Sequence, residues 1–280
     1  MPRRGVMRIA EAIRAAASTL SDISDTARLD AELLMAHALG VERSAMLVRQ
    51  MDDPAPDTFA TLVQRRAACE PIAHILGAQE FYGRSFAVSR DVLIPRGDSE
   101  TLIDAALAFA PAGARVLDLG TGSGALLITA VLEIDDAHGT GIDASPSALR
   151  IAQRNAQQLG VIGARARFLA RDWTKDGWPA DLGTFDLILC NPPYVEEDAE
   201  LSPQVRDYEP ARALFAGTDG LADYRVLMPQ LRALMNEGAL AMFEIGYSQA
   251  DAVTALARSE GFVAQLRHDL ANRPRCVICR

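Results

Sequence analysis

Apolar residues recur at spacings of three and four along residues 8–78, most clearly in ARLDAELLMAHALG and TFATLVQRRAACEPIAHILG. This spacing predicts amphipathic α-helices, because it places the apolar side chains on one helical face. Gly40, Pro54 and Pro71 interrupt the pattern, and such residues commonly mark helix ends and loops. We therefore predict a bundle of several short helices, and we assign it to an N-terminal domain over residues 1–78.

The pattern changes between residues 80 and 95, which read EFYGRSFAVSRDVLIP. Aromatic and β-branched residues surround Gly83 and a polar turn at residues 89–91. This arrangement is typical of a β-hairpin. We predict that residues 79–95 form a hairpin that links two domains.

From Arg96 onward, the helical pattern ETLIDAALAFA leads into short aliphatic and β-branched runs, the first of them separated by the helical patterns GALLITAVLEI and SPSALRIAQRNAQQLG. The strand-like runs are, in order, RVLDL, GTGIDA, ARFLARD, FDLILC, ALAMFEIG, FVAQLRHD and RCVIC. Strands separated by helices of this length predict a parallel sheet with right-handed crossovers. We expect residues 96–280 to form an α/β, Rossmann-like domain with a mostly parallel sheet of seven strands.

The charge of the chain limits its partners. It has 28 Lys and Arg against 37 Asp and Glu, a formal net charge of −9, which disfavours direct binding to nucleic acid or to anionic membranes. No apolar run approaches the roughly 18 residues of a membrane-spanning helix. The N-terminal residues also lack the apolar block of a signal peptide. We therefore expect a cytoplasmic protein with no membrane partner.

Neither the cysteines nor the histidines suggest a metal site. Cys276 and Cys279 form a C-x-x-C, but RCVICR is β-branched and apolar, and strand positions three apart face opposite sides. The histidines are scattered at His37, His74, His138 and His268. Because neither set has the spacing of metal ligands, we predict two incidental strand thiols and no metal.

A glycine-rich loop follows the first strand of the predicted sheet. In VLDLGTGSGALL, Gly120, Gly122 and Gly124 lie between a strand and a helix. Glycines allow a ligand to approach the backbone closely, and the helix that follows presents free N–H groups. Asp143 ends the next strand, 23 positions after Gly120, and is suitably placed for ribose hydroxyls. By itself the loop fits both a nicotinamide cofactor and S-adenosylmethionine.

Other polar and aromatic residues end the neighbouring strands. Asp118 lies two residues before the first glycine, and Asp172 and Trp173 follow the third strand, where an acid and an aromatic face suit an adenine. The fourth strand ends in CNPPYV. Because the carboxyl ends of parallel strands share one edge of a sheet, we expect all these residues to line one ligand site.

The turn CNPPYV offers hydrogen-bond acceptors. Consecutive prolines have no backbone N–H, so a ligand there meets the Asn191 side-chain oxygen, the Pro192 carbonyl and the ring of Tyr194. These groups suit a planar group that carries N–H hydrogens. An amide nitrogen is a poor nucleophile, so positioning rather than a strong base is the expected contribution of the enzyme.

Together these features resemble a class I S-adenosylmethionine-dependent methyltransferase acting on a planar nitrogen. Further segments make the resemblance narrower, and it extends over nearly the whole chain. They are DAELLMAHALG (30–40), PIAHILGAQEFYG (71–83), VLIPRGDSE (92–100), VRDYEPARALFAGTDGL (205–221) and FEIGYSQ (243–249). In these segments, the chain is similar to the peptide chain release factor N5-glutamine methyltransferases, the PrmC (HemK) family.

The resemblance implies a substrate, a cofactor and roles by position. The substrate is the glutamine of the Gly-Gly-Gln loop in class 1 release factors, which the N-terminal domain helps to hold, and we expect the enzyme to be monomeric. The residues expected to bind S-adenosylmethionine are Asp118, Gly120, Thr121, Gly122, Ser123, Gly124, Asp143, Asp172, Trp173 and Asn191. Those expected to bind the glutamine are Asn191, Pro192, Pro193 and Tyr194, of which Asn191, Pro192 and Tyr194 are the expected catalytic residues. Where the family usually has Arg-Pro-Asp/Glu-Thr-Glu, this chain has Gly97 in place of the proline, which predicts a less rigid loop over residues 96–100.

Three other functions remain open from the residues alone. An adenine-N6 nucleic-acid methyltransferase acts on a similar planar amine, but the net charge of −9 argues against it. A nicotinamide-dependent oxidoreductase would explain the glycine loop but would leave Asn-Pro-Pro-Tyr without a role. A binding module without catalysis would bind the cofactor without turnover.

Overall fold

The computed structural model describes residues 7–161 and 163–280. The chain divides into two compact units. One unit extends to Ala78 and also includes Leu201–Tyr208, and the other comprises Gln79–Glu200 and Glu209–Arg280. The segment 201–208, which the sequence analysis included in the methyltransferase range, therefore packs with the helical unit.

The first unit is a small helical bundle, as the apolar spacing predicted. Its helices are α1 (Ile9–Leu20), α2 (Ala27–Leu39), α3 (Arg43–Arg49), α4 (Thr58–Ala67), α5 (Ile72–Leu76) and, from the separate segment, α9 (Pro203–Arg206). Helix α2 ends at Gly40, which adopts a left-handed conformation with φ of 67°. The Tyr208 hydroxyl donates a hydrogen bond to the Ala68 carbonyl, 2.8 Å away, and so connects the separate segment to the rest of the unit.

The predicted hairpin is present. Strands β1 (Ala78–Phe81) and β2 (Arg84–Ala87) pair in a two-stranded sheet. Their turn consists of Tyr82 and Gly83, with φ of 50° and 70°, and two positive φ values are typical of a tight hairpin turn. The polar residues 89–91 lie beyond β2, so they form no part of the hairpin turn.

The second unit contains the predicted seven-stranded sheet. Its strands, in chain order, are β3 (Arg115–Leu119), β4 (His138–Asp143), β5 (Ala166–Ala170), β6 (Phe185–Cys190), β7 (Met235–Glu244), β8 (Ala264–His268) and β9 (Pro274–Cys279). Their order across the sheet is β5-β4-β3-β6-β7-β9-β8, with parallel pairing from β5 to β7. Strand β9 runs antiparallel to both of its neighbours, β7 and β8. This arrangement confirms the mostly parallel Rossmann-like sheet.

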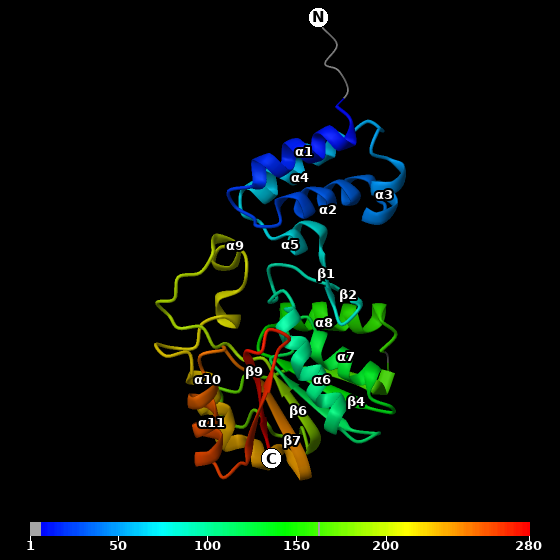
Figure 1. Ribbon diagram of the computed structural model, residues 1–280. Helices are drawn as coiled ribbons and strands as arrows, with labels where there is room; N and C mark the ends of the chain where they lie inside the picture. Colours follow the sequence, from blue (N-terminus) through cyan, green and yellow to red (C-terminus); the bar gives the residue numbers. More distant parts are fainter. Residues whose placement is uncertain (1–6, 162) are drawn as a thin grey trace, which may run out of the picture. The chain divides into compact units, whose positions relative to one another are not determined.

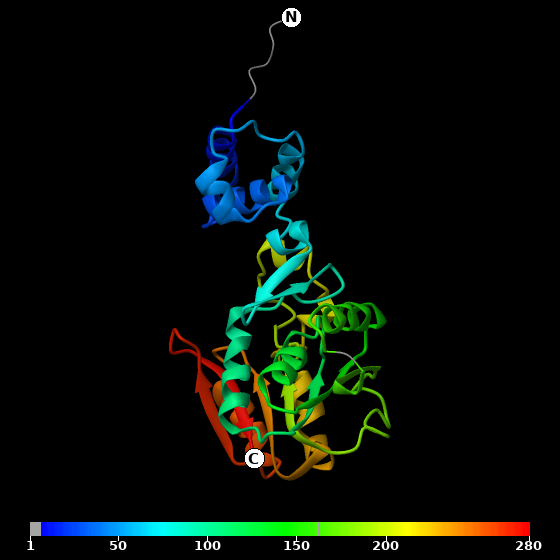
Figure 2. The ribbon, with the colours of Figure 1, turned by 90° about the vertical axis from the view of Figure 1, so that its right-hand side faces the viewer.

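Helices cover both faces of this sheet (Figures 1 and 2). One face packs against α6 (Glu100–Phe109), α7 (Ala125–Glu133) and α8 (Pro146–Gln158). The other packs against α10 (Ala222–Leu227), α11 (Ala250–Ser259) and the 3-10 helix η4 (Met228–Leu234). The shorter 3-10 helices in the described part of the chain are η1 (Gly97–Ser99), η2 (Gly163–Arg165) and η3 (Ala211–Ala213).

Side chains alternate along each strand between the two apolar layers. Cys276 is buried in the layer that contains α7, and Cys279 is buried in the layer that contains α11. The prediction that the two thiols of the C-x-x-C face opposite sides is therefore confirmed, and both thiols are free. No helix in the described part of the chain combines the length and apolar character needed to span a bilayer.

Candidate functional site

The glycine loop connects β3 to α7 in a conformation that needs glycine. Gly120, Gly122 and Gly124 have φ of 75°, 54° and 82°, in the left-handed region that residues with a Cβ rarely adopt. A Cβ on Gly120 would lie 3.0 Å from the ring of Trp173. A Cβ on Gly124 would lie 2.8 Å from Ile128 in the first turn of α7. The loop therefore packs tightly against the elements around it and exposes its backbone to the pocket.

Asp118, near the end of β3, supports the glycine loop. Its carboxyl is buried, and its Oδ2 accepts a hydrogen bond of 2.6 Å from the Thr121 hydroxyl. Burial raises the pKa of Asp118 from an ordinary 3.8 to about 7, and the nearby charge of Asp143 acts in the same direction. Asp118 therefore holds the loop in place through Thr121.

The raised pKa of Asp118 predicts a pH-dependent stability. Because the folded state binds the Asp118 proton more tightly than the unfolded state, this group stabilises the fold fully below about pH 4, and the contribution is lost as pH rises through about 7. The variant Asp118→Asn does not titrate. We expect its melting temperature, relative to that of the unmodified protein, to rise by about 4 °C between about pH 5 and about pH 8. Thermal unfolding across this range measures the difference, and parallel curves would contradict the assignment.

Asp143, at the end of β4, fixes two backbone segments. Its Oδ2 accepts from the N–H of Gly122 at 2.9 Å, and its Oδ1 accepts from the N–H of Ser145 at 2.8 Å. The Ser145 hydroxyl in turn accepts from the N–H of Ala148 and caps the start of α8. Each carboxylate oxygen keeps further acceptor capacity for a ligand hydroxyl. The carboxylate therefore orders the glycine loop and still lines the pocket.

Asp172 and Trp173 follow the end of β5, and Trp173 gives the pocket an aromatic side. The Trp173 indole N–H donates a hydrogen bond of 2.6 Å to Asp223 Oδ1, from α10. Thr174 holds the Asp172 carboxylate, because Asp172 Oδ1 accepts hydrogen bonds from both the backbone N–H and the hydroxyl of Thr174. These hydrogen bonds lower the pKa of Asp172, with the Thr174 hydroxyl the largest cause. Asp172 is therefore ionised beside an indole whose orientation is fixed by Asp223.

The turn at the end of β6 leaves one acceptor without a protein donor. Asn191 Nδ2 donates to the Ser99 hydroxyl over 3.3 Å, while Asn191 Oδ1 is buried and has no hydrogen-bond partner. The Tyr194 hydroxyl donates to Glu244 Oε1 at 3.2 Å. Gln249 Nε2 donates to the Tyr194 carbonyl at 3.0 Å and so holds the far end of the turn.

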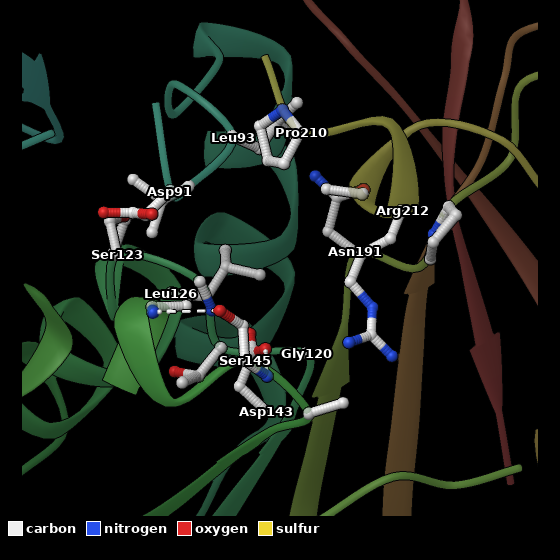
Figure 3. A pocket seen from close by; sticks show the side chains of 18 of the residues that line it. Asp91, Leu93, Gly120, Ser123, Leu126, Asp143, Ser145, Asn191, Pro210 and Arg212 are labelled. Carbon is white, nitrogen blue, oxygen red and sulfur yellow. Dashed lines mark hydrogen bonds between the residues drawn. The ribbon is translucent and has the colours of Figure 1, made fainter. Parts of the chain in front are cut away.

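These strand ends meet around one pocket within the second unit (Figure 3). Asp143 and Ser145 lie on one side, and Asn191 and Arg212 lie on the other. The expected site residues that line the pocket are Gly120, Thr121, Gly122, Ser123, Asp143, Asp172, Trp173, Asn191 and Pro193. The expected site residues that do not line it are Asp118, Gly124, Pro192 and Tyr194. In residues 7–161 and 163–280, no three His, Cys, Asp or Glu side chains gather as a metal site would.

The sequence analysis did not identify several residues that support the predicted site residues. They are Ser99, Asn155, Asp223, Glu244 and Gln249, each of which holds a predicted site residue or its loop through a side-chain hydrogen bond. Glu244 ends β7, and burial raises the pKa of its carboxyl to about 7. Glu244 and Ser99 lay in the segments FEIGYSQ and VLIPRGDSE, but nothing in one sequence showed that they meet Asn191 and Tyr194.

Asn155 connects the hairpin to the glycine loop. Its Oδ1 accepts from the N–H of Ala87, and its Nδ2 donates to the carbonyls of Ala87 and Ser123 at 3.0 and 2.8 Å. The residue is fully buried in α8. Its amide therefore satisfies three backbone groups of the hairpin and the glycine loop.

Replacing Asn155 with alanine is expected to lower the free energy of unfolding by about 3 kcal/mol, because it leaves these backbone groups without their partner. Urea unfolding measures the loss. Gln157→Ala, on the exposed side of the same helix, is the matched control and should change stability by less than about 0.5 kcal/mol. Equal stability of the two variants would show that the Asn155 bonds are not needed.

Comparisons with known proteins agree with this geometry. A family model described as a methyltransferase domain matches residues 111–254, and one described as the PrmC N-terminal domain matches residues 11–77. A crystal structure of a methyltransferase from Pyrococcus furiosus superposes with a TM-score of 0.52 at 15% identity, over 77% of this chain and 97% of that chain. The chain therefore contains a methyltransferase domain, and its fold is shared with a solved methyltransferase.

Similar proteins of known name identify the family of methyltransferases to which the chain belongs. A protein from Cereibacter sphaeroides, named release factor glutamine methyltransferase, is 40% identical over 98% of this chain and 99% of its own length. A protein of the same name from Rhodospirillum rubrum is 39% identical over 90% of this chain and 78% of its own length. The chain belongs to the release factor glutamine methyltransferase family, which confirms the resemblance seen in its motifs.

Proposed function

We propose that this chain transfers a methyl group from S-adenosylmethionine to the side-chain amide nitrogen of the glutamine in the Gly-Gly-Gln loop of class 1 peptide chain release factors. One observation carries the proposal: Asn191 Oδ1 is buried without a donor at the end of β6, in a residue that lines the same pocket as the glycine loop. A buried acceptor without a partner costs free energy, so it calls for a ligand that brings N–H groups. The names of the family's members supply the substrate class.

The residues around the pocket fit S-adenosylmethionine. Gly120 and Gly122 line the pocket, Asp143 keeps acceptor capacity for ribose hydroxyls, and Trp173 offers an aromatic face. When bound, S-adenosylmethionine supplies an electrophilic methyl group on a positively charged sulfur. We infer that Gly120–Ser123, Asp143, Asp172 and Trp173 contact it, while Asp118 and Gly124 act by shaping the loop.

Asn191 and Pro192 would orient the glutamine. An amide nitrogen has two hydrogens, and Asn191 Oδ1 and the Pro192 carbonyl are two acceptors on one turn. With both hydrogens held, the nitrogen keeps one orientation toward the glycine-loop side of the pocket, and this positioning is the main catalytic contribution. Tyr194, held by Glu244, and Pro193 would pack against the amide plane. The proton that leaves the nitrogen passes to solvent.

The remaining expectations belong to this proposal. Class 1 release factors are the proposed partner, and the helical unit helps to bind them. We propose that the protein is a cytoplasmic monomer. We also propose that it makes no direct contact with nucleic acid, which the net charge of −9 supports. The chemistry needs no metal, because no negative charge develops on the glutamine that would require one.

Mass spectrometry of a purified class 1 release factor tests the function. The factor is incubated with this protein and S-adenosylmethionine, beside a control factor whose loop glutamine is replaced. We expect one added methyl group, located on that glutamine by peptide mapping and absent from the control. Methylation of adenine in an oligonucleotide but not of the factor would replace this proposal with the nucleic-acid amine function.

A further inference from the structure

Two turns follow strands that end at the same edge of the sheet as the pocket. Strand β9 runs antiparallel to both β7 and β8, so β7 and β8 are parallel to each other and end at one edge. Strand β6, which is followed by Asn191 in the pocket, is also parallel to β7. The turn after β7 comprises residues 245–249, and the turn after β8 comprises residues 269–273. Both turns therefore lie at the edge of the sheet that carries the pocket.

Asp269 fixes the turn after β8. Its Oδ1 accepts hydrogen bonds of 2.9 Å from the backbone N–H groups of Ala271 and Arg273. Its own N–H donates to the Arg273 carbonyl, and its carbonyl accepts from the N–H of Asn272. Leu270 in this turn is 109% exposed, more than any other large apolar side chain in the described part of the chain. A well-fixed turn therefore holds an apolar side chain in solvent (Figure 2, where the turn is red).

Arg273 joins this turn to the turn after β7. The carbon of its guanidinium lies 5.8 Å from the centre of the Tyr247 ring, within the range of a cation–π contact. Tyr247 is itself 61% exposed. Tyr247, Leu270 and Arg273 therefore form one exposed surface of two apolar side chains and a guanidinium, which we call the rim patch.

The turn that carries Tyr247 is connected to the Asn-Pro-Pro-Tyr turn. Gln249 Oε1 accepts a hydrogen bond of 3.0 Å from the N–H of Gly246, and Gln249 Nε2 donates to the Tyr194 carbonyl, also at 3.0 Å. One side chain therefore joins the turn after β7 to the turn proposed to bind the substrate glutamine.

The turn that carries Leu270 is connected to the same side of the pocket. Arg275 pairs with Asp269 at 3.2 Å and with Asp98 at 2.7 Å, and only 12% of its side chain is exposed. Asp98 immediately precedes Ser99, which lines the pocket and contacts Asn191. Both halves of the rim patch are therefore attached to segments that hold the glutamine side of the pocket.

Ion pairs restrain the loop over residues 96–100 on both sides of Gly97. Arg96 pairs with Glu209, whose side chain is 1% exposed, and Asp98 pairs with Arg275. The missing proline predicted a less rigid loop, but these side chains hold it. The connection from the rim patch to Ser99 therefore runs through a restrained segment.

We propose that the rim patch is a docking surface for the domain of the release factor that carries the Gly-Gly-Gln loop. This inference rests on the proposed function. A glutamine that enters the pocket from a folded protein brings the surface around its loop against the pocket edge, where the rim patch lies. The matching surface is an apolar side chain beside a carboxylate or carbonyl group, because Leu270 and Tyr247 offer area for burial and Arg273 offers donors.

Steady-state methylation of a class 1 release factor tests the docking surface. We expect Leu270→Ser to raise KM for the factor by about tenfold, because the complex loses a buried apolar side chain. The value of kcat and the affinity for S-adenosylmethionine should stay within about twofold, since binding by the rim patch is the same before and during the reaction. Leu270 is fully exposed in the free protein, so its melting temperature should not change. Tyr247→Ser should raise KM in the same way.

Val263→Ser is the matched control. Val263 is 70% exposed and lies just before β8, at the opposite edge of the sheet, so its replacement should leave KM within about twofold. An equal rise in KM for Val263→Ser and Leu270→Ser would mean that general surface polarity, and not the rim patch, governs binding of the factor.

Three other results would overturn the inference, each in a different way. Glutamine methylation with an unchanged KM in Leu270→Ser would reject the docking surface alone. Sedimentation of the unmodified protein as a dimer that Leu270→Ser dissociates would assign the rim patch to a second copy of this chain. Absence of glutamine methylation by the unmodified protein would reject the proposed function itself, and the docking surface with it.

Discussion

Asn191→Ala is expected to lower kcat for glutamine methylation by about 100-fold while leaving the affinity for S-adenosylmethionine within about twofold. Asn191 lines the pocket, and its Oδ1 is a buried acceptor without a protein donor, so the alanine variant loses one of the two acceptors proposed for the substrate amide. The glycine loop and Asp143 do not depend on Asn191 for any hydrogen bond. Single-turnover methylation and calorimetric titration of S-adenosylmethionine measure the two quantities separately.

Asn236 provides the matched control for this result. It is also a partly buried asparagine on the sheet, but it lies at the beginning of β7, at the opposite edge, where it donates to Asp186. Asn236→Ala should leave kcat within about twofold. If Asn191→Ala lost S-adenosylmethionine binding but kept the single-turnover rate, Asn191 would belong to the cofactor side of the pocket.

Asp143→Ala is expected to weaken S-adenosylmethionine binding by about 30-fold or more, with a smaller effect on the rate of bound enzyme. Two losses add in this variant. The ribose hydroxyls lose a charged acceptor, and the backbone N–H groups of Gly122 and Ser145 lose the carboxylate that holds them. The glycine loop should therefore be less ordered as well as less attractive to the ligand. Calorimetric titration measures the affinity.

A control for the change of charge is available in the same βα unit. Asp135 is exposed just before β4, at the edge of the sheet away from the pocket. Asp135→Ala removes the same charge and should change the affinity for S-adenosylmethionine by less than about twofold, because exposed charges at this distance are screened. Equal losses in the two variants would mean that net charge, and not the contacts of Asp143, governs binding.

The local patterns predicted the elements well because each depends on near neighbours in the chain. The three and four residue spacing in ARLDAELLMAHALG became α2, and Gly40 ended that helix. The glycines of DLGTGSG adopted positive φ values, which glycine permits without strain. In the same way, the strand period placed Cys276 and Cys279 on opposite faces. In each case, the residues that decide the structure lie within a few positions of one another.

The sequence patterns did not predict contacts between segments that are distant in the chain. Glu244 lies 50 positions after Tyr194 and Ser99 lies 92 positions before Asn191, yet these side chains meet because β6 and β7 are neighbours and the loop over residues 96–100 lies against their ends. The segment 201–208 likewise packs with the helical unit although it follows the turn at 191–194 in the chain. No periodicity in the sequence encodes such pairings.

The sequence by itself determined the helical and parallel α/β units, the glycine loop, the Asn-Pro-Pro-Tyr turn and, through its motifs, the family. These follow from backbone preferences and apolar periodicity, which act locally. Only the tertiary structure decided that Asp118 supports the loop through Thr121 and that Asp223 orients Trp173. It also decided that Ser99 contacts Asn191 and that Glu244 contacts Tyr194. The physical reason is that a buried polar group takes its hydrogen-bond partners from whatever the fold brings beside it, irrespective of distance along the chain.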